Sequence, residues 1–286
     1  MKITSEYNLR SLQHEQRMLE LYRKGSASDG ELLEPLANSC RRAAAFEWCL
    51  HEDAGSIRRL WEEAARALAQ GFLRKRSGFA RRSEELHLAL NLSIASRNFD
   101  LVSALMHTTV ARSSVKTGRF ARSPLLLLNG YLFLARAILE RRKDHITTAQ
   151  RLLENARPDS DYEWWAKQFP STHEAAWKID EHEATRGLLS VIARFMVDRE
   201  PLSDKDSDLD SPAAADFAEL MDRAMLSLDQ FIDSEINHRP KLYLWLPGIA
   251  VSILAESAGL PLNWLAVRQR DNQKGYARLP LGLVCQ

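Results

Sequence analysis

Apolar residues recur along this 286-residue chain at intervals of three and four positions, the spacing of an amphipathic α-helix. The clearest case follows Ser211-Pro212, where the serine can cap a helix and the proline can occupy its first turn. The apolar positions of this segment are Phe217, Leu220, Met221, Ala224, Met225, Leu228, Phe231 and Ile232. The chain shows no credible strand alternation, so the sequence predicts an all-α fold.

The same spacing predicts about a dozen helices. They span roughly residues 5–24, 34–51, 56–75, 83–96, 99–112, 124–141, 145–156, 172–198, 212–237, 242–258 and 261–268. A second serine–proline pair, Ser123-Pro124, is expected to open one of them, and the last ten residues are expected to be irregular. We expect a single helical domain over residues 1–286, with possible sub-layers 1–160 and 161–286, because this length fits one large domain or two small ones.

The most apolar stretch is Leu242–Val267, which raises the question of a membrane span. Only 14 residues, Leu242–Ala255, run without a charge, whereas a spanning helix needs about 20. We therefore predict a buried helix, with Pro247 in its first turn and Gly259 at its end. The side chains expected in the core are Leu246, Ile249, Ile253 and Leu254.

A faint internal repeat lies in the middle of the chain. The segments "SIASRNFDLVSALM" and "AILERRKDHITTAQRLL" align at an offset of 44 residues, which pairs Arg97 with Arg141 and Asp100 with Asp144. Each segment is expected to form a helix, a short polar turn and a second helix, the unit of helical-repeat proteins. Because arrays usually need three copies, two similar hairpins within one domain remain the alternative.

The composition excludes several broad classes of protein. A formal charge of +1 gives no overall attraction to nucleic acid or to anionic membranes. The three cysteines, Cys40, Cys49 and Cys285, favour reduced thiols and a cytoplasmic location over a disulfide framework. The first 19 residues carry charges throughout, so no signal peptide is expected.

Searches for catalytic and metal-binding motifs fail at specific positions. Four His-Glu dipeptides lack the second histidine of the zinc motif H-E-x-x-H, since Met18, Gly55, Trp177 and Arg186 stand in its place. The glycine pair Gly25 and Gly30 has the spacing of a phosphate-binding loop, but Glu31 replaces the required lysine. We therefore expect neither an enzyme nor a cofactor.

Three weaker patterns keep alternatives open. Two Glu-x-x-His pairs, Glu84/His87 and Glu235/His238, would fit a di-iron centre only with carboxylates from two further helices. Alternate aspartates from Asp204 to Asp210 imitate a calcium loop, but the essential glycine and glutamate positions hold Leu209 and Ala215. The adjacent tryptophans Trp164 and Trp165 could form a ligand platform or belong to the core.

Two charge blocks are candidates for partner recognition. The predicted loop at residues 198–211 carries a net charge of −4 over Asp198–Asp210, with acids Asp198, Glu200, Asp204, Asp206, Asp208 and Asp210. The segment "RKRSGFARR" has a net charge of +5, from Arg74, Lys75, Arg76, Arg81 and Arg82. Either block could be a solvated face or a docking surface for a partner of opposite charge.

The late apolar segment "RPKLYLWLPGIAVSILAESAGLP" resembles the immunity protein 49 family of bacterial polymorphic toxin systems. The likeness lies in a small and apolar helix at Ile249–Ala258, followed by the Gly259-Leu260-Pro261 turn. A helix, charged turn and helix at Leu86–Met106 is similar as well, and the resemblance covers roughly residues 40–265 as a pattern of helices. The tail "GYARLPLGLV" departs from the "YLP"-like ending common in that family.

This resemblance implies a non-enzymatic antidote that binds a cognate toxin domain and blocks it. The expected partner is a basic, nuclease-like or nucleotide-modifying domain, contacted by the acidic residues of 198–210, with neither membrane nor direct nucleic-acid binding. The main alternative is a helical-repeat adaptor for another protein. An enzyme or metalloprotein with an unrecognised site, and a nucleic-acid or regulatory protein acting through Arg74–Arg82, are further alternatives.

Overall fold

A computed structural model describes residues 5–26, 30–74, 79–110, 122–158, 172–198, 211–234, 244–271 and 278–284. Within these ranges the chain forms twelve α-helices, one short 3-10 helix and no strand, which confirms the all-α prediction. The elements are α1 (Ser5–Ser26), η1 (Gly30–Leu32), α2 (Leu33–His51), α3 (Ala54–Arg74), α4 (Phe79–Ala95), α5 (Phe99–Val110), α6 (Arg122–Leu139), α7 (Asp144–Glu154), α9 (Thr172–Asp198), α10 (Pro212–Ser234), α11 (Leu246–Ser257), α12 (Asn263–Arg270) and α13 (Leu281–Val284).

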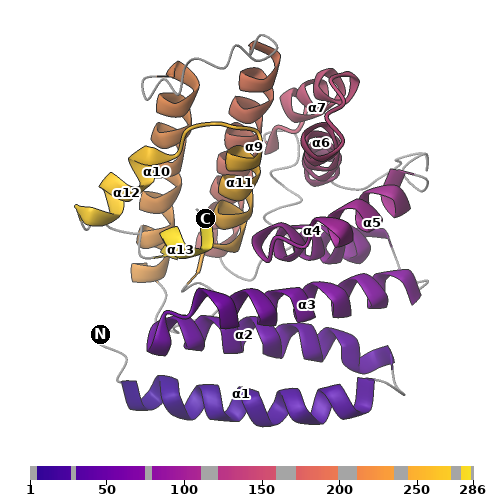
Figure 1. The fold of residues 1–286 in the computed structure, drawn as a ribbon, viewed down its shortest axis with the longest axis vertical. Helices are drawn as coiled ribbons and strands as arrows, with labels where there is room; N and C mark the ends of the chain where they lie inside the picture. The colour runs from indigo at the N-terminus through magenta and orange to yellow at the C-terminus, as the bar shows by residue number, and fades with distance from the viewer. Residues whose placement is uncertain are drawn as a thin grey trace.

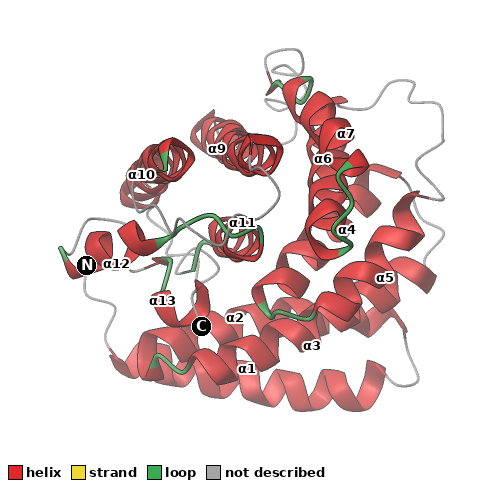
Figure 2. Cartoon of the chain, turned by 45° about the horizontal axis from the view of Figure 1, so that its top comes forward, coloured by secondary structure: helices red, strands yellow, loops and turns green. Residues whose placement is uncertain are grey.

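The helices form a curved array around one central helix. Helices α1, α2 and α3 lie side by side as a layer, and the pairs α4–α5, α6–α7 and α9–α10 continue from it (Figure 1). The array bends so that α11 lies in its interior, where it packs against α4, α6, α9 and α13 (Figure 2). A late segment therefore covers the inner face of elements formed much earlier in the chain.

Three helix pairs are joined by turns that contain a left-handed residue. A residue one or two positions after the first helix adopts a left-handed conformation, namely Glu52 (φ 52°), Arg97 (φ 59°) and Arg141 (φ 53°). In the two predicted repeats, equivalent hydrogen bonds follow, from Asn98 N to Ser93 O and from Arg142 N to Ala137 O. Left-handed residues commonly end helices in this way. The predicted likeness of α4–α5 to α6–α7 is present in the backbone. The α2–α3 turn shares the left-handed residue but has a different hydrogen bond, from Glu52 N to Trp48 O.

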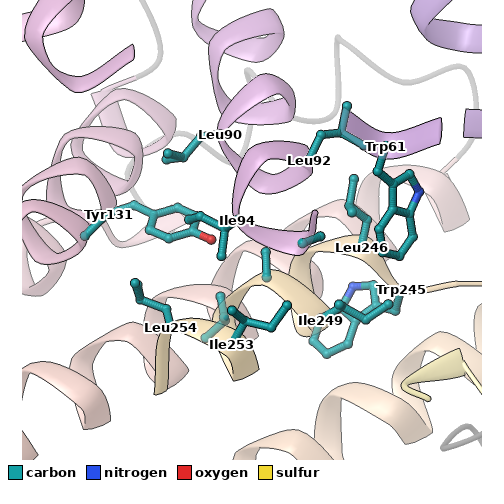
Figure 3. Close-up of a cluster of buried hydrophobic side chains, with 14 of the residues drawn as sticks. Trp61, Leu90, Leu92, Ile94, Tyr131, Trp245, Leu246, Ile249, Ile253 and Leu254 are labelled. Atoms are coloured by element: carbon teal, nitrogen blue, oxygen red, sulfur yellow. The ribbon is translucent and has the colours of Figure 1, made fainter. Parts of the chain in front are cut away.

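The predicted buried helix is α11. Pro247 lies in its first turn, and Gly259 ends it with a φ of 82° and a hydrogen bond from its N–H to Glu256 O of 2.8 Å. Leu246 is 9% exposed, and Ile249, Ile253 and Leu254 are 0% exposed. In Figure 3 these side chains face Leu90, Leu92 and Ile94 of α4, Tyr131 of α6 and Trp61 of α3. Each fully buried aliphatic side chain contributes about 1.5–3 kcal/mol.

The chain end differs from the sequence-based expectation. The last ten residues were expected to be irregular, yet Leu281–Val284 form α13, and Leu279, Leu283 and Val284 are fully buried. Two arginines hold this helix, because Arg58 Nη2 donates to Gly282 O at 2.9 Å and Arg97 Nη2 donates to Val284 O. Sequence periodicity missed α13 because four residues are too few to show a helical repeat.

Other helix boundaries differ from prediction by a few residues. Helix α6 begins at Arg122, so Ser123 lies inside its first turn rather than ahead of it. Helix α11 begins at Leu246 rather than Leu242, since Pro247 favours the start of a helix. No helix within the described ranges has the length and apolarity needed to cross a membrane.

Candidate functional site

Of the acidic residues predicted to bind a partner, the structure describes only the first, Asp198. Asp198 is the last residue of α9 and is exposed. Glu200, Asp204, Asp206, Asp208 and Asp210 lie outside the described residues. The segment joins α9 to α10, which pack against each other, and an Arg194–Asp216 ion pair of 3.2 Å links the two helices near this edge.

Most other sequence candidates also fall outside the described side chains. This applies to the basic residues Arg74–Arg82, whose side chains are not described, and to Trp164-Trp165 and Glu235/His238. The side chain of Glu84 is not described either, whereas His87 points into the protein interior. Across the described ranges, no three His, Cys, Asp or Glu side chains are grouped so that they could hold a metal ion.

Of the three cysteines in the prediction, the structure describes Cys40 and Cys49, whereas Cys285 lies outside the described residues. Cys40 is buried, Cys49 is exposed, and both are free. Burial raises the pKa of Cys40 to about 12, and neighbouring atoms that displace part of the water around the sulfur of the otherwise exposed Cys49 raise its pKa to about 11. Because the thiolate is the reactive form, these pKa values leave both side chains protonated and poorly nucleophilic at neutral pH.

A polar cluster that the sequence did not reveal centres on Glu181 of α9. Lys178 Nζ lies 2.6 Å from Glu181 Oε2, and Trp245 Nε1 donates to Glu181 Oε1 at 3.2 Å. The Glu181 side chain is 18% exposed and that of Lys178 is 36% exposed. Burial alone would raise the pKa of Glu181, but the Lys178 charge and the two hydrogen bonds outweigh it and lower that pKa. The carboxylate is therefore ionised at neutral pH.

Gly248 allows Trp245 to reach this carboxylate. Trp245 immediately precedes α11, and its indole ring lies over the first turn of that helix, against Gly248. A Cβ atom at position 248 would overlap the ring at Cε3. The backbone of Trp245 is fixed as well, because its N–H donates to Arg278 O at 3.0 Å. Because Gly248 has no side chain, the Trp245 indole can lie against α11 and still donate its hydrogen bond to Glu181.

His87 of α4 contacts Tyr131 of α6, and the Glu181 charge acts on its pKa. Their rings meet edge to face with centroids 5.9 Å apart. Neither His87 Nε2 nor the Tyr131 hydroxyl has a hydrogen-bond partner in the described part of the protein. Burial lowers the pKa of His87 to about 4, although the negative charge of Glu181 opposes this, and burial raises the pKa of Tyr131. Both side chains are therefore neutral at pH 7.

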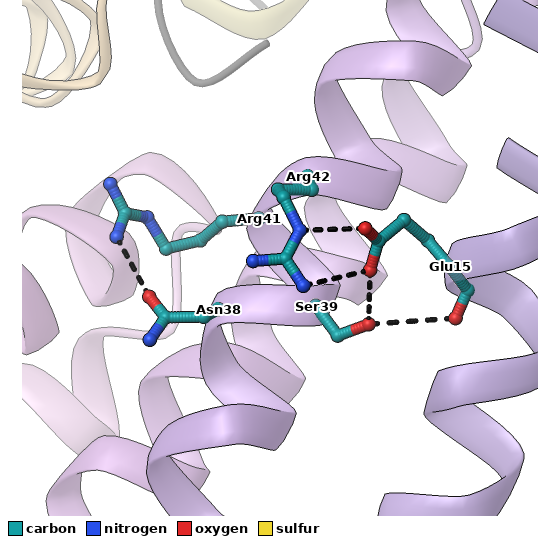
Figure 4. A network of polar contacts seen from close by, with 5 residues as sticks. All are labelled: Glu15, Asn38, Ser39, Arg41 and Arg42. Atoms are coloured by element: carbon teal, nitrogen blue, oxygen red, sulfur yellow. Dashed lines mark hydrogen bonds and ion pairs between the residues drawn. The ribbon is translucent and has the colours of Figure 1, made fainter. Parts of the chain in front are cut away.

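Arg41 of α2 supplies a second cation. Its neighbour Arg42 is paired with Glu15 of α1, through Nε to Oε1 at 2.6 Å and Nη2 to Oε2 at 3.1 Å. Arg41 extends away from that pair and donates a weak hydrogen bond of 3.4 Å from Nη1 to Asn38 Oδ1 (Figure 4). Burial and the Arg42 charge lower the pKa of Arg41 to about 10, while the Glu181 charge raises it. The guanidinium remains charged at pH 7.

We name Arg41, His87, Lys178, Glu181 and Trp245 the polar junction. Its members come from α2, α4, α9 and the residue before α11. At neutral pH the set contains two cations, one carboxylate, one neutral imidazole and one indole N–H. Within this set, Lys178 and Trp245 hold the ionised Glu181 carboxylate through two hydrogen bonds.

Sequence reasoning had little means of finding the polar junction. Only Lys178 and Glu181 show a local signal, the i,i+3 spacing of a helical ion pair. No sequence spacing connects Arg41 or His87 to them, because these residues stand on separate helices and are linked to Glu181 only through the effect of its charge on their pKa. Comparisons with protein families, with curated proteins and with solved structures find no match to this chain.

Proposed function

We propose that this protein is an immunity protein, which binds a cognate bacterial toxin domain and neutralises it by stoichiometric contact. The observation that carries the proposal is the Ile249–Pro261 segment, whose sequence resembles the immunity protein 49 family. In the fold this segment is α11 and its glycine-ended turn, around which the array curves. The resembling residues thus belong to the centre of the fold rather than to a surface loop that varies freely.

A helical body of this kind suits inhibition by contact. Its packed helices present broad and preformed faces, and blocking a toxin requires neither cofactor nor catalysis. The net charge of −4 at Asp198–Asp210 supports a basic partner, because complementary charge accelerates association and opposes wrong pairings. Most of the binding energy would come from a few buried anchor residues elsewhere in the interface.

The decisive experiment uses the cognate toxin domain, identified by pull-down or from the adjacent gene. Co-expression should restore growth to cells that produce the toxin, and the two proteins should co-purify in a fixed ratio. A cognate toxin that neither binds this protein nor loses toxicity in its presence would refute the proposal. Co-purification without protection would instead support the adaptor described below.

The acidic segment has its own test. Changing Asp204, Asp206, Asp208 and Asp210 to Asn should slow association, most strongly at low salt, since the Debye length is about 8 Å at physiological ionic strength. A matched control removes the same charge from exposed carboxylates elsewhere, with Glu20→Gln, Asp100→Asn, Glu154→Gln and Asp271→Asn. Equal association rates for the two variants would assign the effect to net charge rather than to this segment.

A helical-repeat adaptor for another protein is the second candidate. The observation that favours it is the recurrence of one turn at Glu52, Arg97 and Arg141, at near-equal spacing. Stacked helix pairs of this kind commonly offer extended surfaces for protein partners. An adaptor would bind its partner without protecting cells from a toxin, so the growth assay separates the two candidates.

A further inference from the structure

Helix α1 forms one edge of the array and packs along one side only. It lies at the end of the layer that continues through α2 and α3, and within the described ranges it packs mainly against α2 and η1 (Figure 1). The buried side chains of α1 share this inner side, namely Asn8, Leu12, Glu15 and Leu19. The opposite side of a helix of 22 residues, about 33 Å long, therefore faces solvent.

The outer side of α1 carries charges in a regular order. Each residue advances about 100° around a helix, so the positions farthest from the buried residues can be identified. They are exposed and form what we call the α1 stripe: Glu6, Arg10, Gln13, Arg17, Glu20 and Lys24. Glu6 and Arg10 form an ion pair along the helix, but their side chains remain 70% and 77% exposed and so stay within reach of a partner.

The α1 stripe is complementary to a reversed copy of itself. When the order is read from both ends, Glu6 corresponds to Lys24, and Arg10 corresponds to Glu20. A two-fold axis that relates two antiparallel copies of α1 produces each of these two contacts twice, which gives four pairs of opposite charge. A parallel pairing would instead align each residue with its own copy and oppose like charges.

The order of charges also selects one register. A shift of the antiparallel pair by one helical turn in one direction would place Glu6 against Glu20. The same shift in the other direction would place Arg10 against Lys24. Both shifts oppose like charges, so the arrangement with four complementary pairs is favoured over its neighbours.

Exposed apolar side chains flank the α1 stripe. Tyr7 is 51% exposed, Leu9 is 44% exposed and Leu21 is 61% exposed. These are three of the six large apolar side chains that are exposed among the described residues, so such surface is concentrated on α1. The antiparallel pairing brings Tyr7 of one copy within one helical turn of Leu21 of the second copy. Their contact supplies apolar burial, which matters because exposed ion pairs contribute little on their own.

We propose that α1 is the interface of a weak homodimer, in which two copies of the chain pair their first helices in antiparallel orientation. The α1 stripe sets orientation and register, and the apolar side chains beside it add burial. A contact confined to one helix of each copy is smaller than a standard stable interface. The dimer therefore forms reversibly, at high protein concentration and low salt. The proposal does not depend on the proposed immunity function.

The test is sedimentation velocity of the full chain at pH 7 and low salt, at protein concentrations up to about 100 µM, the range in which weak interfaces associate. The wild-type protein should shift from monomer to dimer as its concentration rises, and added salt should reverse the shift. A basic variant, Glu6→Lys with Glu20→Lys, and an acidic variant, Arg10→Glu with Lys24→Glu, each oppose like charges across the axis. Each should raise the Kd of the homodimer by about tenfold or more.

A mixture of the two variants tests orientation and register directly. Basic and acidic copies together restore four pairs of opposite charge, so an equimolar mixture should form a heterodimer with a Kd close to that of the wild-type homodimer. The control Glu154→Lys with Asp271→Lys reverses two exposed charges outside α1 and should dimerise as the wild type does. Because all substituted side chains are exposed, the variants should keep the wild-type Tm and circular dichroism spectrum, which checks that they fold.

Three results would overturn the proposal. A wild-type protein that stays monomeric at the highest concentration has no such interface. A dimer that persists unchanged in both charge variants forms through a different surface. A mixture that stays monomeric, although the wild type dimerises, excludes the antiparallel register of the α1 stripe.

Discussion

His87 is a half-buried residue whose ring nitrogen Nε2 is shielded from water, and the neutrality of its imidazole couples stability to pH. Its pKa in the folded protein is lowered to about 4 by burial, whereas the ordinary value is about 6.5. As the pH falls below about 6.5, the unfolded chain takes up a proton that the folded protein still excludes. Stability is therefore retained above this range and lost progressively as the pH falls towards 4.

We predict that His87 alone destabilises the protein by about 2 kcal/mol between pH 7 and pH 5. The His87→Gln variant should show a smaller fall in unfolding free energy over this range, as measured by urea denaturation at both pH values. His51→Gln, which removes an exposed histidine, provides the control. An identical pH dependence of the unfolding free energy in wild type and His87→Gln would show that the folded protein does not hold the His87 imidazole neutral.

Trp245 gives a second test at the residue scale. The Gly248→Ala substitution would place a Cβ where the indole now lies, so the ring must move and its hydrogen bond to Glu181 must lengthen or break. Overpacking of this kind costs about 1–3 kcal/mol. We expect a lower Tm and an altered tryptophan fluorescence spectrum. Gly55→Ala, at a position where the nearest contact is an exposed Asp53 oxygen at 3.3 Å, should change neither strongly.

At the scale of the elements, the helical turns show how one backbone conformation can serve different roles. Arg97 and Arg141 share a left-handed φ, which costs a non-glycine residue about 1–2 kcal/mol. The Arg97 side chain pairs with Glu256 at 2.6 Å and donates to Val284 O, so it joins its turn to α11 and α13. Arg141 is exposed. Side-chain contacts therefore offset the backbone strain at Arg97.

Glycine substitution at the two turns should have opposite effects. Arg141→Gly should raise the unfolding free energy by roughly 0.5–1 kcal/mol, because glycine removes the left-handed strain. Arg97→Gly should lower it by about 1–3 kcal/mol, because the half-buried Glu256 carboxylate and the Val284 carbonyl lose their hydrogen bonds to the guanidinium. Urea denaturation of both variants is the measurement. A stabilised Arg97→Gly would show that its contacts to Glu256 and Val284 contribute little.

The central helix has a direct test of its burial. Ile253 is 0% exposed, so Ile253→Asp would bury an unpaired charge and cost several kcal/mol. Leu226→Asp, on the exposed face of α10, serves as the control because Leu226 is 56% exposed. We expect the first variant to be insoluble or to melt far below wild type, and the second to melt near it. A soluble Ile253→Asp with an unchanged Tm would contradict this.

The sequence predicted individual helices better than the contacts between them. Helix α10 could be predicted because its apolar stripe is a local property, and Phe217, Met221, Met225 and Leu228 are indeed buried. Pro247 and Gly259 likewise mark helix ends through their own backbone preferences. The contacts of Arg97 with α13 depend on residues nearly 190 positions away, and no local pattern encodes such a distance. The polar junction was missed for the same reason.

At the scale of the whole molecule, late elements tie early ones together. Simple helical arrays contact only their neighbours, and their unfolding can lose cooperativity. Here α11 packs against α4, α6 and α9, and α13 reaches α3 through Arg58. One contiguous cluster of buried side chains extends from Leu12 to Val284. These closing contacts should make the array behave as a single cooperative unit.

We therefore predict one unfolding transition in urea, with the same midpoint by far-UV circular dichroism and by tryptophan fluorescence. Fluorescence reports on both regions, because tryptophans occur in the first layer (Trp61) and beside α11 (Trp245). Leu283→Ala, which opens a cavity under α13 at a fully buried position, should lower both midpoints together at a cost of about 2–5 kcal/mol. Val267→Ala, at a residue 45% exposed, is the control and should change neither midpoint much. Separate midpoints in the wild-type protein would show that the α1–α3 layer unfolds independently, and α13 would then be a peripheral attachment to the array rather than its closure.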